Sequence, residues 1–246
     1  MKKYIILPLT LFTHSVIIAQ QPEWAYSFNN PQVLENLTDV SVNGSNRFAI
    51  VGGGNSGISM DPIGQLPTYN STGNFVAAYN ENAQILYVYP TVGNAFAVKV
   101  FATGNVFVSG AFTGTQNFDL TVGSSPLTAV GYDTYLQEFN SAGQFQWAAK
   151  ATAEGTPSKI EILADGRIVV AGRSYLEAVA TLSNNNTVNL SKGAYILEFS
   201  ATGQFTNAAN FSAPDPEAYV YVNIMGKLNK HGVQTREPTK KGIDSS

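Results

Sequence analysis

The side chains of this chain that could carry out catalysis are its carboxylates. Asp119 and Asp133 flank one long connection, and two acids can cleave a glycosidic bond as acid and base when their separation is suitable. Each also fits a structural role, since Asp119 can fix its loop through an Asx turn and Asp133 opens an expected strand. Glu138 and Glu198 are equivalent positions of a repeat whose first copy has Ala78, a variation typical of solvated strand faces. We therefore expect a non-enzymatic protein and keep a secreted carboxylate-dependent carbohydrate-active enzyme as the alternative.

Other catalytic and metal-binding groups are scarce. The sequence has no cysteine, and its two histidines are His14, in an N-terminal apolar run, and His231, in a region without a clear pattern. This leaves cysteine nucleophiles, histidine-based triads and His/Cys metal sites without partners. No run of alternating acidic residues indicates a calcium loop. The sequence predicts neither a cofactor nor a metal ion.

One glycine motif superficially fits dinucleotide binding. Gly52, Gly54 and Gly57 satisfy G-x-G-x-x-G just after an expected strand at 48–51. The residues that follow, 58–62, do not begin a helix, and no acidic residue stands at the required distance. We expect these glycines to form a loop.

The N-terminus predicts export. Lys2 and Lys3 precede an apolar run at 4–18 that ends at Ala19, which is the pattern of a signal peptide over residues 1–19. The alternative is an uncleaved anchor, but the run is short for a membrane span, and no later stretch is apolar enough for one. We expect an extracellular or cell-surface protein, with the periplasm as the alternative location. The net charge of −3 argues against a nucleic acid partner.

A segment of strands and turns recurs every 60 residues. The period aligns Tyr79 with Phe139 and Phe199, and a fixed period of this size indicates a repeat architecture. Each copy is expected to hold four short strands joined by turns with glycine, which adopts positive φ at little cost. Within residues 20–232 we expect copies at about 24–87, 88–147 and 148–207, a partial fourth copy at 208–232, and then a disordered basic tail at 233–246. The turn positions are Asn43-Gly44 in the first copy and Gly104, Gly143, Gly166 and Gly203 in the other two.

Two segments of the second copy carry a family resemblance. GNVFVSGAFTGTQNFDL at 104–120 and GYDTYLQEFNSAGQFQWAAK at 131–150 resemble the bacterial β-propeller repeats called SBBP. Gly104, Asp119, Asp133, Gly143 and Trp147 fill the characteristic places of that repeat. The resemblance implies an exported β-propeller protein of bacteria with type IX secretion, and it implies a fold rather than a reaction.

The first and third copies depart from this pattern. Trp147 is replaced by Tyr87 and by Asn207, and a second tryptophan occurs only as Trp24, in the first strand expected after the signal peptide. Ala194 stands in the third copy where the second has Asp133. The resemblance is thus strongest in the second copy.

The predicted fold is all-β: a propeller-like array of about three and a half four-stranded antiparallel blades, forming an incomplete ring. Propellers typically have four to eight blades, so the sequence indicates a fragment of a longer protein. Open ends would expose apolar blade faces through which the chain could self-associate. A curved β-solenoid or a sandwich built from the same strands is the alternative, because hairpin patterns do not define how sheets close.

The register of the repeat also separates core aromatics from candidate binding residues. Aromatic residues that recur with the period are expected in the core. Tyr69, Tyr132 and Tyr175 lie outside the register, in or beside the long loops where binding sites often occur. We predict a binding or adhesion scaffold that contacts an unknown protein or glycan partner through these loops, with ordinary loop anchoring as the alternative role of the tyrosines.

Overall fold

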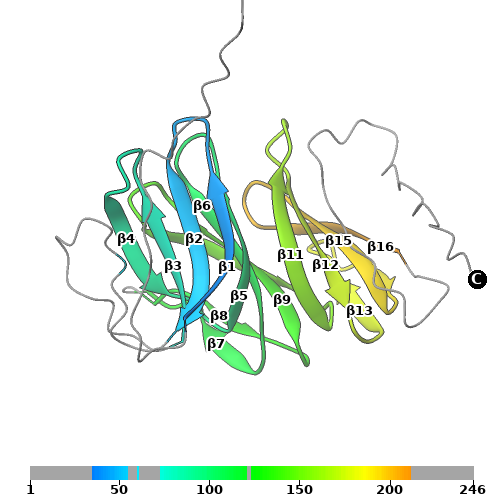
Figure 1. Ribbon diagram of the computed structural model, residues 1–246. Helices are drawn as coiled ribbons and strands as arrows, with labels where there is room; N and C mark the ends of the chain where they lie inside the picture. The colour runs from blue at the N-terminus through cyan, green and yellow to red at the C-terminus, as the bar shows by residue number, and fades with distance from the viewer. Residues whose placement is uncertain (1–34, 55–59, 61–72, 121–122, 212–246) are drawn as a thin grey trace, which may run out of the picture.

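A computed structural model describes residues 35–54, 60, 73–120 and 123–211 (Figure 1). The described residues form strands and turns without helices, so none of them belongs to a helix that could cross a membrane. The predicted signal peptide, Trp24, Tyr69, residues 212–232 of the partial fourth copy with His231, and the basic tail lie outside the described residues.

Three four-stranded antiparallel sheets make up the body of the molecule, and we call them blades 1, 2 and 3. Blade 1 has the order β1-β2-β3-β4, with strands β1 (Glu35–Val42), β2 (Phe48–Gly54), β3 (Gly73–Tyr79) and β4 (Ile85–Pro90). Blade 2 has the order β5-β6-β9-β10, with strands β5 (Asn94–Val100), β6 (Val106–Phe112), β9 (Asp133–Phe139) and β10 (Phe145–Ala151). Blade 3 has the order β11-β12-β15-β16, with strands β11 (Gly155–Ile162), β12 (Ile168–Ser174), β15 (Gly193–Phe199) and β16 (Phe205–Phe211).

Two small hairpins extend the connections between the second and third strands of a blade. They are β7 (Thr115–Asn117) with β8 (Pro126–Thr128) in blade 2, and β13 (Ala178–Thr181) with β14 (Thr187–Leu190) in blade 3. Figure 1 shows the three blades standing side by side in chain order, as an open array. The predicted all-β, propeller-like array of four-stranded antiparallel sheets is confirmed.

The core lies between successive blades, because successive side chains of a strand point to opposite faces of its sheet. One cluster fills the space between blades 1 and 2 and includes Val51, Val98 and Tyr135. A second cluster fills the space between blades 2 and 3 and includes Leu136 and Ile160. A third, smaller cluster lies on the outer side of blade 1, where Met60, Ile50, Phe75, Ala77 and Tyr79 pack together. The periodic aromatics Tyr79, Phe139 and Phe199 are all buried, as predicted for core positions.

The tight turns of the three blades share one geometry but not one residue type. Gly104, Gly143, Gly166 and Gly203 all have positive φ, as the glycine pattern predicts. In blade 1 Gly44 lies in the turn, as predicted, but the expectation that it has positive φ is wrong. The turn closes with hydrogen bonds between Asn43 and Arg47, and this places Asn46 at φ 57°. Ala83 holds the corresponding place in the β3–β4 turn, with φ 58°.

Candidate functional site

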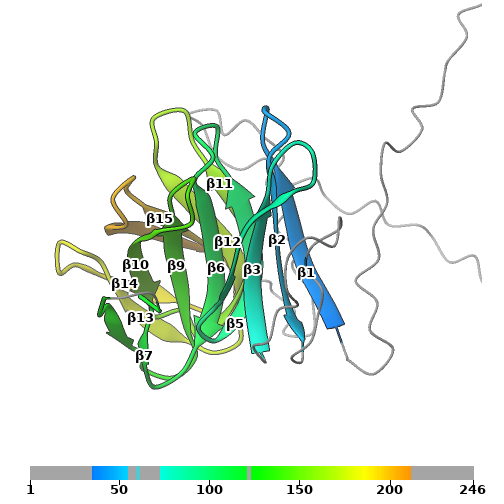
Figure 2. The same cartoon turned by 90° about the vertical axis from the view of Figure 1, so that its left-hand side faces the viewer.

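The long connections of blades 2 and 3 emerge at the same end of the array. In a four-stranded antiparallel blade, the connection between strands two and three lies at the end where strand one begins. Figures 1 and 2 both place the β7–β8 and β13–β14 hairpins at this end, opposite the tight turns. We call it the loop end, and the opposite end, with the turns at 43–47, 101–105, 140–144 and 163–167, the turn end.

Tyr132 is half-buried at the loop end and is held in place from both sides. The Asn94 amide Nδ2 donates to its hydroxyl at 3.0 Å, and its own backbone N–H donates to Oε2 of Glu154 at 3.2 Å. The backbone N–H of Gly155 donates to the Tyr132 carbonyl, also at 3.2 Å. Tyr132 therefore connects the start of β5 with the start of β11.

Tyr175 is exposed directly after β12 and reaches the same glutamate. Its backbone N–H donates to the Glu154 carbonyl at 2.9 Å. Its hydroxyl is hydrogen-bonded to that of Thr156 at 2.9 Å, and the Arg173 guanidinium carbon lies 5.6 Å from its ring centre. This contact has the geometry of a cation–π pair. The structure thus brings together two of the three predicted tyrosines around Glu154, whereas Tyr69 lies outside the described residues.

Glu154 adopts a backbone conformation that side chains rarely take. Its φ is 44°, whereas the connection between blades 1 and 2 has a glycine, Gly93, at its residue of positive φ, with φ 61°. A left-handed conformation of a residue other than glycine costs roughly 1–2 kcal/mol. The Glu154 carboxylate lies over Gly131, where a Cβ atom would collide with it. Sequence reasoning missed Glu154, although it stands only three residues beyond the end of β10.

Two buried phenols lie next to this surface. Burial raises the pKa of Tyr135 and of Tyr195 far above their usual range, and the nearby Tyr132 phenol adds to the increase in both. The Tyr195 hydroxyl is hydrogen-bonded to that of Thr134 at 2.9 Å. The Tyr135 ring packs over Gly110 and the Tyr195 ring over Gly172, each glycine lying on the neighbouring strand. A Cβ atom on either glycine would collide with the ring.

Gly52 holds the same place in blade 1, and this explains the dinucleotide-like motif. A Cβ atom on Gly52 would overlap the Asn36 carbonyl oxygen and press on the Phe75 ring. Gly52 and Gly54 lie inside β2, so the expectation that they form a loop is wrong. Gly57 lies outside the described residues.

The contacts of the Asp133 side chain stabilise the fold. Its carboxylate is buried, and Oδ2 accepts from Lys150 Nζ at 2.7 Å and from the Val130 backbone N–H at 3.1 Å. Thr152 Oγ1 donates to the same oxygen at 3.4 Å. Lys150 belongs to the W-A-A-K segment, and its pairing with Asp133 across β9 and β10 was not predicted.

Asp119 follows Phe118, which packs against Phe112 and Tyr135 in the core. The side chain of Asp119 lies over Gly123, and its backbone carbonyl accepts from Asn117 Nδ2 at 2.8 Å. It is Asn117 that closes this loop, because its Oδ1 accepts from the Ser125 N–H at 2.7 Å.

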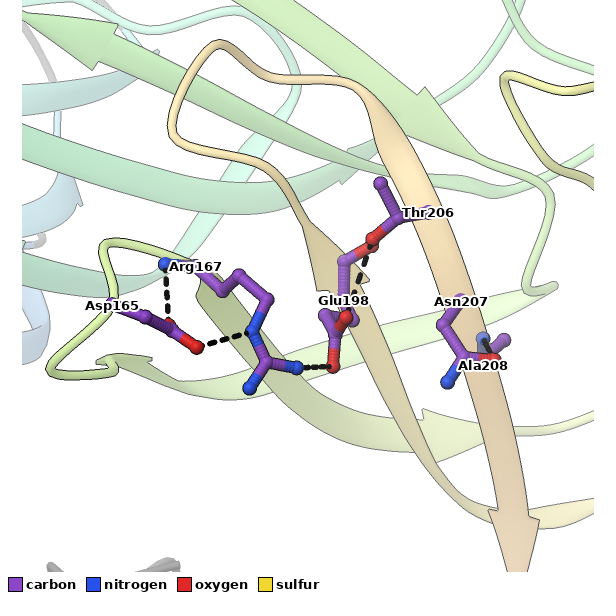
Figure 3. A network of polar contacts seen from close by, with 6 residues as sticks. All are labelled: Asp165, Arg167, Glu198, Thr206, Asn207 and Ala208. Carbon is purple, nitrogen blue, oxygen red and sulfur yellow. Dashed lines mark hydrogen bonds and ion pairs between the residues drawn. The ribbon is translucent and has the colours of Figure 1, made fainter.

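Glu138 and Glu198 contact residues of the turn end instead. Asn105 Nδ2 donates to Glu138 at 2.6 Å. Arg167 Nη1 donates to Glu198 at 2.7 Å and Arg167 Nε to Asp165 at 2.8 Å, a network shown in Figure 3. The two glutamates therefore do not join Asp133 at the loop end. Among the residues that the structure describes, no group of three or more His, Asp or Glu side chains could hold a metal ion.

Trp147 and the turn glycines join neighbouring blades at the turn end. Gly203 lies so close to Trp147 that a Cβ atom would collide with the indole, and Gly143 lies in the same way over Tyr87. In blades 2 and 3, the glycine of the last turn thus packs on an aromatic residue in the last strand of the preceding blade. Gly104 has a similar close neighbour in Arg47 of blade 1.

Comparisons with known proteins add little to this geometry. No family model and no curated protein matches the chain. A crystal structure of a protein of unknown function from Bacteroides caccae is similar, with a TM-score of 0.41 and 10% sequence identity over 77% of this chain and 50% of that one. The chain therefore spans about half the length of that protein. The resemblance to SBBP repeats stays a prediction.

Proposed function

We propose that this chain is an exported, non-enzymatic binding scaffold that recognises a glycan at its loop end. The observation that carries the proposal is the meeting of the half-buried Tyr132 and the exposed Tyr175, from two different blades, around Glu154. Five hydrogen bonds hold this surface, which we call the tyrosine–glutamate surface: three involve Tyr132 and two Tyr175. Groups held in place in this way lose little conformational entropy when a ligand binds.

The chemistry of the surface favours a sugar over a wholly apolar ligand. A phenol ring offers an apolar face and a polar tip. The amide of Asn94, the carboxylate of Glu154 and the guanidinium of Arg173 supply donors and acceptors beside the rings. Ligand sites typically combine aromatic side chains with a few such oriented polar groups. A pyranose presents the matching pattern of C–H faces and hydroxyl groups.

The acids at this end support binding rather than hydrolysis. Asp133 is buried in an ion pair with Lys150, and the Glu154 carboxylate accepts a backbone hydrogen bond from Tyr132. Both carboxylates thus have partners that stabilise the folded loops. The carboxylate-dependent enzyme stays an alternative prediction.

Binding to an array of immobilised neutral and acidic oligosaccharides tests the proposal. We expect Tyr132→Ala and Tyr175→Ala each to weaken binding of the selected sugar about tenfold or more, which is about 1.4 kcal/mol. Leu86→Ala, which removes an exposed apolar side chain from β4 of blade 1, is the control and should leave binding unchanged. Absence of binding to every sugar, or binding that survives both tyrosine substitutions, would overturn the proposal. Release of reducing ends that Asp133→Asn abolishes would favour the enzyme.

A further inference from the structure

An apolar row is exposed on the first strand of blade 1. Leu37, Val40 and Val42 of β1 are all exposed. Their partners on β2 are Gly52, Ile50 and Phe48, and directly opposed residues of an antiparallel pair share one face of the sheet. Asp39 and Ser41, between them, lie on the other face and contact blade 2. The apolar row therefore faces away from the rest of the array.

The same repeat positions are buried or partly buried in the other two blades. Each first strand carries a bulge, at Thr38, Phe96 and Ser158, which aligns the three strands residue by residue. Val40 is 58% exposed, but its equivalents Val98 and Ile160 are 0% and 1% exposed. Val42 is 60% exposed, whereas its equivalent Val100 is 4% exposed. Blades 2 and 3 each have a blade packed on this face, and among the described residues none packs on that of β1.

The rest of this face of blade 1 is already covered. Ile50, Phe75, Ala77 and Tyr79 are buried there with Met60, and the Tyr79 hydroxyl donates to the Met60 carbonyl at 2.8 Å. The exposed apolar row of β1 thus borders a covered apolar part of the same face.

The opposite end of the array does not match this row. The far face of blade 3 carries Lys159 and Glu161 on β11, at the positions that Asp39 and Ser41 hold in blade 1. Their partners on β12, Ala171 and Val169, are apolar but buried. It also carries Glu198, paired with Arg167, and Asn207 in place of Trp147 (Figure 3). A head-to-tail contact between two copies would bury the charged groups that border Val169 and Ala171, and desolvating them is costly. Lys159 also cannot accept a hydrogen bond as Asp39 does at the junction of blades 1 and 2.

We propose that two copies of this chain associate through the outer face of β1, with Leu37, Val40 and Val42 of one copy against those of the other. An apolar row is complementary to itself, so a two-fold arrangement buries both rows at once. Because the far face of blade 3 is charged, association stops at a dimer instead of continuing into a filament. The proposal is independent of glycan binding, since the tyrosine–glutamate surface belongs to blades 2 and 3.

Sedimentation equilibrium of the purified chain over about a hundredfold range of concentration tests this association. We expect a monomer–dimer equilibrium that Val40→Lys shifts fully to monomer. Val179→Lys is the matched control, because Val179 is 56% exposed on β13 of blade 3, and this variant should dimerise like the unchanged chain. Both substitutions are at exposed positions, so the melting temperatures should stay close to that of the unchanged chain.

Cysteine cross-linking gives a second measurement that does not depend on the lysine variants. The chain contains no cysteine, so Val42→Cys introduces the only thiol. Mild oxidation should convert this variant, but not Val179→Cys, into a disulfide-linked dimer in high yield. A chain that is monomeric at all concentrations would overturn the proposal. So would a dimer that Val40→Lys leaves intact, or open-ended oligomers.

Discussion

At the scale of single residues, the turns show which glycines the backbone requires. Gly166 has φ 86°, and a Cβ atom there would have only an ordinary contact with Ala201. Gly203 has φ 79° as well, but a Cβ atom there would collide with the Trp147 ring. Gly44 has neither a positive φ nor a neighbour within 4 Å of a Cβ atom. Substitutions at these three positions therefore distinguish the cost of a left-handed backbone from the cost of a steric collision.

We expect a graded loss of stability from alanine at these positions. Gly166→Ala should lower the free energy of unfolding by about 1–2 kcal/mol through the left-handed conformation alone. Gly203→Ala should lose a further roughly 1–3 kcal/mol because the indole must move. Gly44→Ala should stay within about 0.5 kcal/mol of the unchanged chain. Urea denaturation measures all three, and equal losses at Gly166 and Gly203 would contradict the contact with Trp147.

Asp165 reports on the charged network of Figure 3. Hydrogen bonds from the Arg167 side chain, and then from its backbone, hold the pKa of Asp165 below its usual value. A carboxylate whose folded-state pKa lies below the unfolded value adds stability at pH values above about 4, and this stability is lost as the pH falls through the folded-state pKa. Because Asp165 and Arg167 are both exposed, the effect on stability is small.

An NMR titration of the Asp165 carboxyl carbon tests whether Arg167 lowers the pKa of Asp165. Arg167→Gln should raise the pKa of Asp165 toward its usual value, because the guanidinium is lost. Glu198→Gln is the control: it removes the other partner of Arg167 and should leave the Asp165 titration nearly unchanged. A pKa of Asp165 that does not respond to Arg167→Gln would show that the ion pair does not form in solution.

At the scale of elements, two lysine–carboxylate pairs that look alike differ in burial. Lys150 and Asp133 join β10 to β9 within blade 2, and the carboxylate of Asp133 has no solvent exposure. Lys99 and Glu161 join β5 to β11 across two blades, and both side chains keep contact with water. The N···O distance is 2.7 Å in each pair, so distance alone does not distinguish them.

Removing the lysine should affect the two pairs very differently. Lys150→Met leaves a buried carboxylate without its cation, which should cost about 3–5 kcal/mol of stability. Lys99→Met should cost less than about 1 kcal/mol, as for other solvent-exposed pairs. The double variant Asp133→Asn/Lys150→Met should recover part of the loss, because no charge is then buried. Thermal unfolding followed by circular dichroism compares them, and equal costs would refute the structural role of Asp133.

The strands were predictable from the sequence, whereas the residues that connect them were only partly so. Alternation and the 60-residue period indicate the four strands of each blade, and the aromatics Tyr79, Phe139 and Phe199 follow as core residues. Asn46 could not be recognised as a left-handed turn residue, because the hydrogen bond that closes its turn determines its conformation and the neighbouring Gly44 suggests another place.

The candidate site shows the same limit. The period places Tyr132 and Tyr175 outside the register, and both loops must emerge at one end of the array. Both tyrosines bond to Glu154 because of its positive φ, and a glutamate in the sequence does not indicate this conformation. Lys150 was visible in the repeat motif, but its pairing with Asp133 needs the register of β9 against β10.

At the scale of the whole molecule, blades 1 and 2 are joined by side chains that hydrogen-bond to the backbone of the neighbouring blade. Asp39 Oδ2 accepts from the Val98 N–H at 2.9 Å, and Ser41 Oγ accepts from the Val100 N–H at 3.0 Å. Asn43 Nδ2 donates to the Phe101 carbonyl at 3.0 Å. The three residues alternate along the chain from β1 into the turn that follows it. Their side chains, on one face of this segment, therefore hydrogen-bond to the backbone groups along the edge of β5.

Ser41→Ala tests whether this contact holds the two blades together. The Val100 N–H is buried, and leaving it without an acceptor should cost about 1–3 kcal/mol. Amide hydrogen exchange should show the loss of protection at Val100, with Val98 still protected through Asp39. Ser158→Ala, which removes a hydrogen bond from Ser158 to Ala171 inside blade 3, is the control and should leave Val100 unchanged. If Val100 stays fully protected in Ser41→Ala, the apolar cluster between the blades, and not the serine, holds the edge of β5 in place.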